Sequence, residues 1–333
     1  MKKSLRRVAL LLGALLLGAL LLGALLLGAL AVGVAIAFLF NAWHDPISGG
    51  QSPDNFFASR EKARIYASFD PTIERQFVRL TPENANGWFH TFAEPIQSFE
   101  LYQSQNPTRP TATRRVIVLQ PLGAWKPEEA DLLEPLRAYC SDFFQLPARI
   151  VPPLSLAPVD NSSRPSGYFP GRKQYDAGLI LSQILEPNLP TDAVAYLGVT
   201  MEDLKADDLS FVFGLGSWHE RVGVYSLGRY FPKKRAVKLA PLDKKRALYR
   251  AMQVLNHETG HMLGLTHCTV YRCSMNGAIS LPDSDRTPLE YCPLCQQKLA
   301  WNIGYSVSER AHQLQNFYRK EGLQNSPVET PKE

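Results

Sequence analysis

The sequence predicts a mixed α/β domain that follows an amino-terminal transmembrane helix. Short β-rich runs alternate with segments of helical periodicity from about residue 115 onward, which is the pattern of an α/β sheet. A long uncharged apolar run lies near the amino terminus. The 333 residues, 45% hydrophobic and 20% charged, suffice for one large domain with extensions.

The apolar run Val8–Phe40 follows the basic start MKKSLRR and repeats the unit GALLL. As a helix it would be about 50 Å long, against about 30 Å of hydrocarbon in a bilayer. The apolar core of a signal peptide has only about 7–15 residues, so residues 1–40 are predicted to be a retained signal anchor. Cleavage and secretion stay open, because Ala35-Ile36-Ala37 has the small-x-small pattern of a signal-peptidase site.

The distribution of charge predicts the orientation of this anchor and disfavours nucleic acid as a partner. The formal net charge is +5, but Lys2, Lys3, Arg6 and Arg7 supply four of those charges. Because they precede the apolar run, the amino terminus is predicted to be cytoplasmic and the rest of this single-pass protein outside. The remaining chain lacks the basic balance of a nucleic-acid-binding domain.

Composition divides the chain after the anchor. Residues 41–62 are rich in Pro, Gly, Ser, Asp and Asn, and we predict a linker there. Residues 63–114 are rich in aromatic side chains and are predicted to form an extension that packs on the main domain. The domain itself is assigned to residues 115–323, and the polar residues 324–333 to a frayed tail.

The elements of the main domain follow from hydrophobic periodicity. Strands are predicted at 115–120, 148–151, 193–200, 210–215 and 221–229, with the later ones pairing as hairpins. Helices are predicted at 127–144, 174–185, 241–263, 295–303 and 307–321, with a helix-like turn at 201–204. Residues 152–172 and 276–291 are predicted loops. Pro135 does not suit a helix interior, so a kink or a later start is expected there.

The segment HETGHMLGLTHCTVYRCSM begins with His257, Glu258 and His261 on the long predicted helix, with the two histidines one turn apart. Residues four apart lie on one helix face, so both imidazoles can reach one ion. His267 supplies a third ligand if the chain turns sharply after the helix, and Gly264 permits that turn. Three protein ligands with one open position are typical of a catalytic zinc site. The extended pattern HExxHxxGxxH followed by a methionine is far more specific than HExxH alone.

Four of the five cysteines lie close together in the sequence: Cys268, Cys273, Cys292 and Cys295. Four thiolates with no open position are typical of a structural zinc. Two disulfides are the alternative, and they gain weight in an oxidising compartment. The short spacings resemble zinc-site hairpins more than a disulfide scaffold. The fifth cysteine, Cys140, lies in an apolar helical pattern and is predicted to be a small buried hydrophobe.

Together, HETGHMLGLTHCTVYRCSM and the following CPLC resemble the archaemetzincins, a group of metzincin-like zinc metallopeptidases. The stretch Phe211–Tyr230, FVFGLGSWHERVGVYSLGRY, is similar to the segment that precedes the catalytic helix in that family. The resemblance implies a metzincin-like mixed twisted sheet with an active-site helix. It also implies two zinc ions per chain, one catalytic and one structural, and a peptide or protein substrate.

The resemblance also implies a role for each matching residue. His257, His261 and His267 would hold the catalytic zinc, and Cys268, Cys273, Cys292 and Cys295 the structural one. Met275 would be the methionine of the turn beneath the metal. Glu258 would be the general base that takes a proton from a zinc-bound water during peptide-bond hydrolysis.

Two questions stay open in the sequence. In metzincin-like enzymes an edge strand pairs with an extended substrate, and Arg221–Tyr230 is the candidate for that strand. The alternative to an enzyme is a catalytically silent binding module that zinc stabilises. The presence of Glu258 beside all three histidines favours the enzyme.

Overall fold

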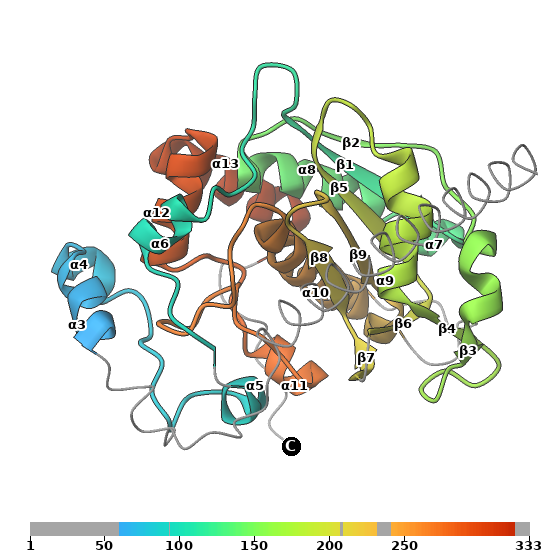
Figure 1. Cartoon of the computed structure of the whole chain (residues 1–333), viewed down its shortest axis with the longest axis horizontal. Coiled ribbons are helices and arrows are strands. Elements are labelled where there is room, and N and C mark those ends of the chain that lie inside the picture. Colours follow the sequence, from blue (N-terminus) through green and yellow to red (C-terminus); the bar gives the residue numbers. More distant parts are fainter. Residues whose placement is uncertain (1–59, 93, 207–208, 232–240, 324–333) are drawn as a thin grey trace, which may run out of the picture. The chain divides into compact units, whose positions relative to one another are not determined.

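The computed structural model describes residues 60–92, 94–206, 209–231 and 241–323 (Figure 1). One compact unit, Pro53–His90 with Pro95–Glu333, contains both sheets and all the predicted metal ligands.

The predicted membrane anchor, residues 1–40, and the predicted tail, residues 324–333, lie outside the described residues. Within the described ranges, no helix combines the length and the apolar composition needed to cross a bilayer.

The main sheet has five strands in the order β2-β1-β5-β9-β8. The strands are β1 (Val116–Leu122), β2 (Ala148–Ile150), β5 (Ala193–Thr200), β8 (Gly214–Ser217) and β9 (Val222–Ser226). All neighbouring pairs are parallel except β8 and β9, which form an antiparallel hairpin. β5 is buried at all of its 8 positions, as expected for a central parallel strand covered on both faces. The predicted mixed α/β fold is confirmed.

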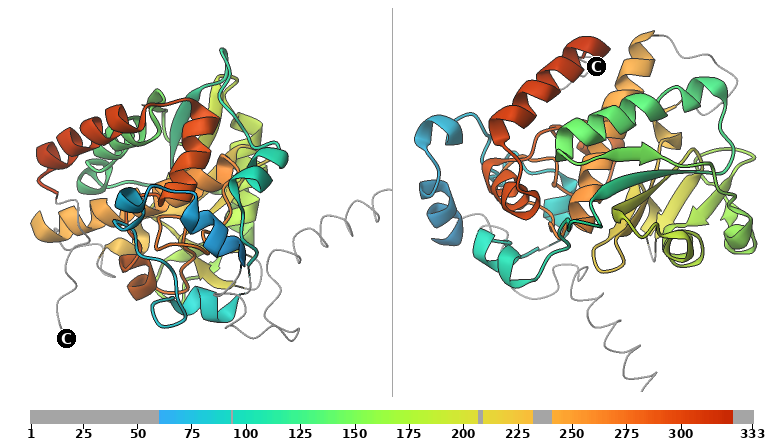
Figure 2. Two further views of the ribbon diagram at one scale, coloured as in Figure 1. Left: turned by 90° about the vertical axis from the view of Figure 1, so that its left-hand side faces the viewer. Right: turned by 90° about the horizontal axis from the view of Figure 1, so that it is seen from above.

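Helices cover both faces of the main sheet. The main helices of the domain are α7 (Pro127–Ala130), α8 (Leu133–Phe144), α9 (Ala177–Ile180), α10 (Pro241–Met262), α12 (Pro293–Ile303) and α13 (Val307–Glu321). Figure 2 shows α8, α10 and α13 on one side of the sheet and α9 on the other. Successive residues of β1 alternate between these layers, because Ile117 packs with the first group and Val118 with the second.

Several predicted elements differ from the observed ones. The helix predicted at 127–144 is interrupted between α7 and α8, and Pro135 lies in the first turn of α8, where its missing N–H has no cost. The helix predicted at 174–185 is wrong at its start, since Lys173–Asp176 form strand β4; a π-helix, Leu181–Leu185, follows α9.

A second sheet of four strands accounts for these differences. Its order is β3-β4-β6-β7, with β3 (Arg164–Pro165), β4, β6 (Asp203–Ala206) and β7 (Leu209–Val212). The helix-like turn predicted at 201–204 is therefore wrong. The strand predicted at 210–215 is divided, because β7 belongs to the second sheet and β8 to the main one. Buried Gln174 donates hydrogen bonds to Asp203 and Leu204, and this pairing across distant segments overrides local helical preference.

Short helices lie before the main sheet in the sequence and in the loop between α10 and α12. Helix α3 (Arg60–Ala67) begins within the last residues of the predicted linker, 41–62, and continues into the extension, which also contains α4 (Pro71–Glu74), α5 (Gly87–Thr91) and α6 (Phe99–Ser104). The loop predicted at 276–291 contains α11 (Leu281–Asp285).

Candidate metal sites

Helix α10 carries His257, Glu258 and His261 and packs against β8, an edge strand of the main sheet. α10 packs against β8, β9 and α8. The helix ends at Met262, and Gly264 follows with a φ of +88°. Leu265 then donates its N–H to the carbonyl of Gly260 at 2.9 Å. This left-handed turn reverses the chain, as Gly264 was predicted to do, and brings His267 back toward the helix.

The structure brings the three predicted histidines together. Nε2 of His257 lies 3.0 Å from Nε2 of His261 and 3.2 Å from Nε2 of His267. Zinc–nitrogen bonds of about 2.0–2.1 Å in a tetrahedron place the nitrogens about 3.3 Å apart. The three nitrogens therefore match the ligand set of one zinc ion.

Two of the imidazoles have a fixed tautomer. Nδ1 of His257 is 3.0 Å from the carbonyl oxygen of Ser274, and Nδ1 of His261 is 2.8 Å from that of Leu265. Because a carbonyl can only accept, each Nδ1 carries the proton and each Nε2 lone pair is free for a metal. Burial, and then the neighbouring His267, lowers the pKa of His257 to about 3, so this ring is neutral at pH 7.

Glu258 lies between the helix and strand β8. Its side chain is 4% exposed, and burial raises its pKa to about 8. A cation at the three histidines would lower this pKa again, because a nearby opposite charge favours the carboxylate. A Cβ at Gly214 would lie 2.4 Å from Glu258 Oε1, and one at Gly216 would lie 2.7 Å from the Glu258 carbonyl oxygen. Only glycine allows the strand to approach this closely.

Among the described residues, the edge strand of the main sheet on the side of α10 is β8, so Arg221–Tyr230 is wrong as the edge strand. β9 occupies most of that range and pairs with β5 on one side and β8 on the other. All five residues of β9 are buried, and the apolar run VGVYS is typical of an interior strand. Arg221 donates to the carbonyl of Ala193, and Arg229 pairs with Asp203 at 2.8 Å.

Met275 lies beneath the helix at the histidine site. A Cβ at Gly260 would lie 2.4 Å from Met275 Sδ and 3.0 Å from the Tyr291 hydroxyl. Met275 is fully buried, so the glycine between the two helical histidines makes room for its thioether.

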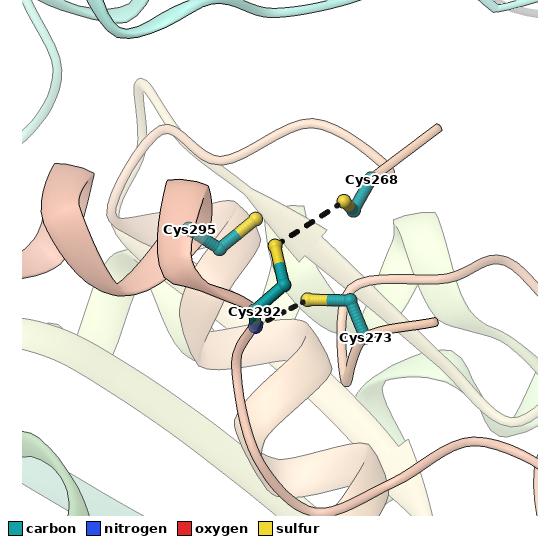
Figure 3. A group of neighbouring side chains, drawn as sticks. All are labelled: Cys268, Cys273, Cys292 and Cys295. Atoms are coloured by element: carbon teal, nitrogen blue, oxygen red, sulfur yellow. Dashed lines mark hydrogen bonds between the residues drawn. The ribbon is translucent and has the colours of Figure 1, made fainter. Parts of the chain in front are cut away.

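The structure also brings the four clustered cysteines together (Figure 3). Their sulfurs all lie within 4.8 Å of one another, and Cys268 Sγ is 3.6 Å from Cys292 Sγ. Tetrahedral zinc with bonds of about 2.3 Å places its sulfurs about 3.8 Å apart. The N–H of Cys292 donates to Cys273 Sγ at 3.3 Å. The sulfurs therefore match a closed four-thiolate zinc site.

All five cysteines of the sequence lie in described residues, and none of them forms a disulfide. Hydrogen bonds from Cys273, Cys292 and Cys295 lower the pKa of Cys268 well below its usual range, which favours a thiolate there. Cys140 is buried in the core packed by α8, as predicted.

One loop joins the two groups of ligands. His267 and Cys268 are neighbours in the chain. The N–H of Cys268 donates to the Met275 carbonyl at 2.8 Å. Asn276 donates to the carbonyls of Cys268 and Tyr271 at 2.7 and 2.9 Å, and accepts from the N–H of Cys273 at 2.8 Å. Buried Asn276 thus fixes the loop that carries ligands of both sites.

Three features of the site were missed in the sequence. Gly214 and Gly216 occupy alternate positions of strand β8, a pattern that indicates close approach of another group to the strand backbone. Asn276 follows the motif directly but has no spacing that indicates its role. The rings of Trp88 and His267 are nearly perpendicular, with centroids 4.7 Å apart, yet Trp88 is far from the motif in the sequence.

Comparison with known proteins agrees with this geometry. The family model described as Peptidase family M54 matches residues 150–301. Archaemetzincin-2 of Rattus norvegicus is 31% identical over 300 residues, covering 82% of this chain and 82% of the relative. Archaemetzincin-2 of Homo sapiens is 29% identical and covers 81% of this chain and 82% of the relative.

Solved structures are also similar to the chain. The crystal structure of archaemetzincin from Archaeoglobus fulgidus, complexed with malonate, is 28% identical, with a TM-score of 0.43. The match covers 55% of this chain and 99% of that one. The 31% identity to archaemetzincin-2 of Rattus norvegicus, over 82% of both chains, shows that this chain belongs to the archaemetzincin family of zinc metallopeptidases.

Proposed function

We propose that the chain hydrolyses peptide bonds at the three-histidine site, with Glu258 as the general base. The contact of buried Glu258 with strand β8 carries this proposal. This contact holds the carboxyl group of Glu258, which follows His257 in the sequence, beside the strand at whose edge an extended peptide can lie.

His257, His261 and His267 would hold the zinc ion. When bound, zinc polarises a carbonyl oxygen and lowers the pKa of water at an open coordination position. Glu258 accepts the proton of the attacking water and passes it to the leaving amine. The hydrogen bonds from His257 to Ser274 and from His261 to Leu265 keep both rings oriented during the reaction.

Strand β8 is the proposed binding site for the peptide backbone. Its inner edge pairs with β9, and it is the last strand of the described main sheet. An extended peptide can add to the outer edge through main-chain hydrogen bonds. Because Gly214 and Gly216 lie against α10, such a peptide would run directly beside Glu258.

We further propose two zinc ions per chain, the second held by Cys268, Cys273, Cys292 and Cys295. The sulfur separations support this ligand set. Metal analysis of the purified protein should give close to two zinc ions per chain. One zinc together with two disulfides found by mass spectrometry would overturn the four-thiolate site.

Membrane attachment through residues 1–40, with the catalytic domain outside, is a separate proposal supported by the apolar run and the basic residues before it. The full chain should stay in the membrane pellet after extraction at alkaline pH. Release in a form shortened near Ala37 would instead indicate signal cleavage and secretion.

Hydrolysis of a broad peptide library tests the enzymatic proposal. The wild-type protein should cleave peptides, and chelation of metal should abolish cleavage. If the protein carries both metals and cleaves nothing in the library, it is a zinc-stabilised binding module instead.

A further inference from the structure

His267 is the one member of the histidine set that does not lie on helix α10. Its position depends on the turn Leu263–Thr266. This turn contains Gly264, and glycine has the greatest backbone freedom of any residue. A ligand on a loop needs support from its surroundings, because small displacements of a functional group carry a large cost. The contacts around this turn therefore decide how well the three-histidine site is formed.

The extension contacts the imidazole of His267 directly. The rings of Trp88 and His267 are 4.7 Å apart between centroids and inclined at 75°, an edge-to-face arrangement that aromatic pairs prefer. Trp88 is 8% exposed. Its indole lies within a space that a side chain at residue 277 would fill, because a Cβ at Gly277 would be 2.4 Å from Trp88 Cδ2.

The neighbouring Asn86 holds the tryptophan in this place. Nδ2 of Asn86 donates to the carbonyl of Gly277 at 2.7 Å, and Oδ1 accepts from the N–H of Trp88 at 3.2 Å. Gly277 belongs to the same loop as the cysteine ligands. Trp88 is thus held at its backbone N–H by Asn86 and at its indole ring by the close approach of Gly277.

The extension also holds the turn before His267. Gln97 donates to the carbonyl of Gly264 at 2.9 Å and accepts from the N–H of Thr266 at 3.2 Å. The Tyr102 hydroxyl donates to the carbonyl of Leu263 at 2.8 Å. Gln97 and Tyr102 are both buried. Together these bonds occupy polar backbone groups on each residue of the turn except Leu265.

We propose that Asn86, Trp88, Gln97 and Tyr102 form a clamp that positions His267, so that metal binding at the histidine site depends on the extension. Trp88 is a positioning residue: it restricts the rotation of the imidazole, and Gln97 and Tyr102 fix the backbone that carries it. The inference rests on the proposed function only in taking the three histidines as a zinc site.

Zinc retention by the full chain in detergent micelles tests the clamp. Each variant is titrated with a chelator while its zinc content is measured. Replacement of a group that supports a metal ligand typically lowers metal affinity about 10- to 100-fold. We expect a loss of this size at the histidine site in Trp88→Ala. The zinc at the cysteine site should remain as tightly bound as in the wild type.

Two further variants separate positioning from general packing. Trp88→Leu keeps apolar bulk but removes the aromatic ring, and it should also weaken zinc binding; Trp88→Phe keeps a ring and should recover most of the affinity. Trp125→Ala is the matched control, since Trp125 also packs on the core but is not one of the four clamp residues, and its zinc affinities should equal those of the wild type. Gln97→Ala should weaken the same zinc as Trp88→Ala.

A cobalt-substituted protein gives a readout independent of activity. The d–d absorption of cobalt at the histidine site should change in Trp88→Leu and return in Trp88→Phe. If folded Trp88→Leu and Gln97→Ala hold both metals as tightly as the wild type, with unchanged cobalt spectra, the clamp is refuted. If the wild type binds two zinc ions and cleaves no peptide, the proposed function fails while the clamp remains testable by zinc retention.

Discussion

The backbone of Gly214 lies against the carboxylate of Glu258, so closely that a Cβ at residue 214 would be 2.4 Å from Oε1. The contact joins the outer strand of the main sheet to the helix that carries two of the histidines. It gives a glycine in a strand a direct influence on the proposed general base.

Gly214→Ala should therefore lower kcat without removing metal. The new methyl group must displace either the carboxylate or the strand, and a displacement of about 1 Å can cost about 100-fold in rate. The matched control is Gly167→Ala, because a Cβ at Gly167 would meet nothing within 4 Å. Steady-state kinetics with zinc analysis checks this expectation, and equal kcat values for Gly214→Ala and the wild type would contradict it.

Glu258→Gln should abolish most peptidase activity and leave the fold and the metal content intact. The amide has the shape of the carboxyl group but cannot accept the proton, and general-base catalysis contributes about 10²–10⁴-fold. Cleavage of a fluorogenic peptide, followed beside circular dichroism and zinc analysis, measures the loss. Activity near that of the wild type would assign the base to another group.

Asn276→Ala should destabilise the protein and weaken zinc binding at the cysteine site. The change leaves buried N–H and carbonyl groups of the Cys268–Cys273 loop without their partner, at about 1–3 kcal/mol for each unsatisfied group. Denaturant unfolding measures the difference in free energy. Asn316→Ala, on the exposed face of α13, is the control and should change stability little.

Loss of the two metals should have different consequences for the fold. Cys295→Ser should unfold the domain or lower its melting temperature markedly, because a structural zinc contributes directly to folding stability. His257→Ala should remove activity and one zinc while the domain stays folded. Thermal unfolding compares the two variants with Cys140→Ala, which removes a thiol outside both sites and should keep both zinc ions. Unfolding of His257→Ala would contradict this division between the sites.

Secondary-structure elements whose ends are marked by nearby residues, such as a helix-capping serine or glycine, could be predicted from the sequence. The helix predicted at 307–321 is confirmed at both ends, where Ser306 caps its first turn and Gly322 ends it with a φ of +61°. The three histidines and the glycine that turns the chain between them lie within one short motif. Their approach to each other follows from helical spacing and one left-handed residue.

Features that depend on distant segments could not be predicted in this way. β4 and β6 are strands because Gln174 and Asp203 meet across the second sheet, and neither segment has a strong strand pattern alone. The edge position of β8 follows from the order of the strands, which periodicity does not reveal. Trp88 reaches His267 through tertiary packing, so its aromatic character alone gave no indication of a role.

The structure of the loop between His267 and Asn276 restricts how many residues related chains can have in this loop. His267 and Cys268, proposed ligands of different sites, are joined by one peptide bond, which fixes their Cα atoms about 3.8 Å apart. Further along, Leu80 donates its N–H to the carbonyl of Val270, and Arg272 donates its N–H to the carbonyl of Val78, so even the middle of the loop is held in register. An insertion or deletion of a single residue between Cys268 and Cys273 would displace one proposed ligand of the cysteine site relative to the other. Family members that keep both metals are therefore expected to keep the number of residues in this loop, whatever side chains they place between the ligands.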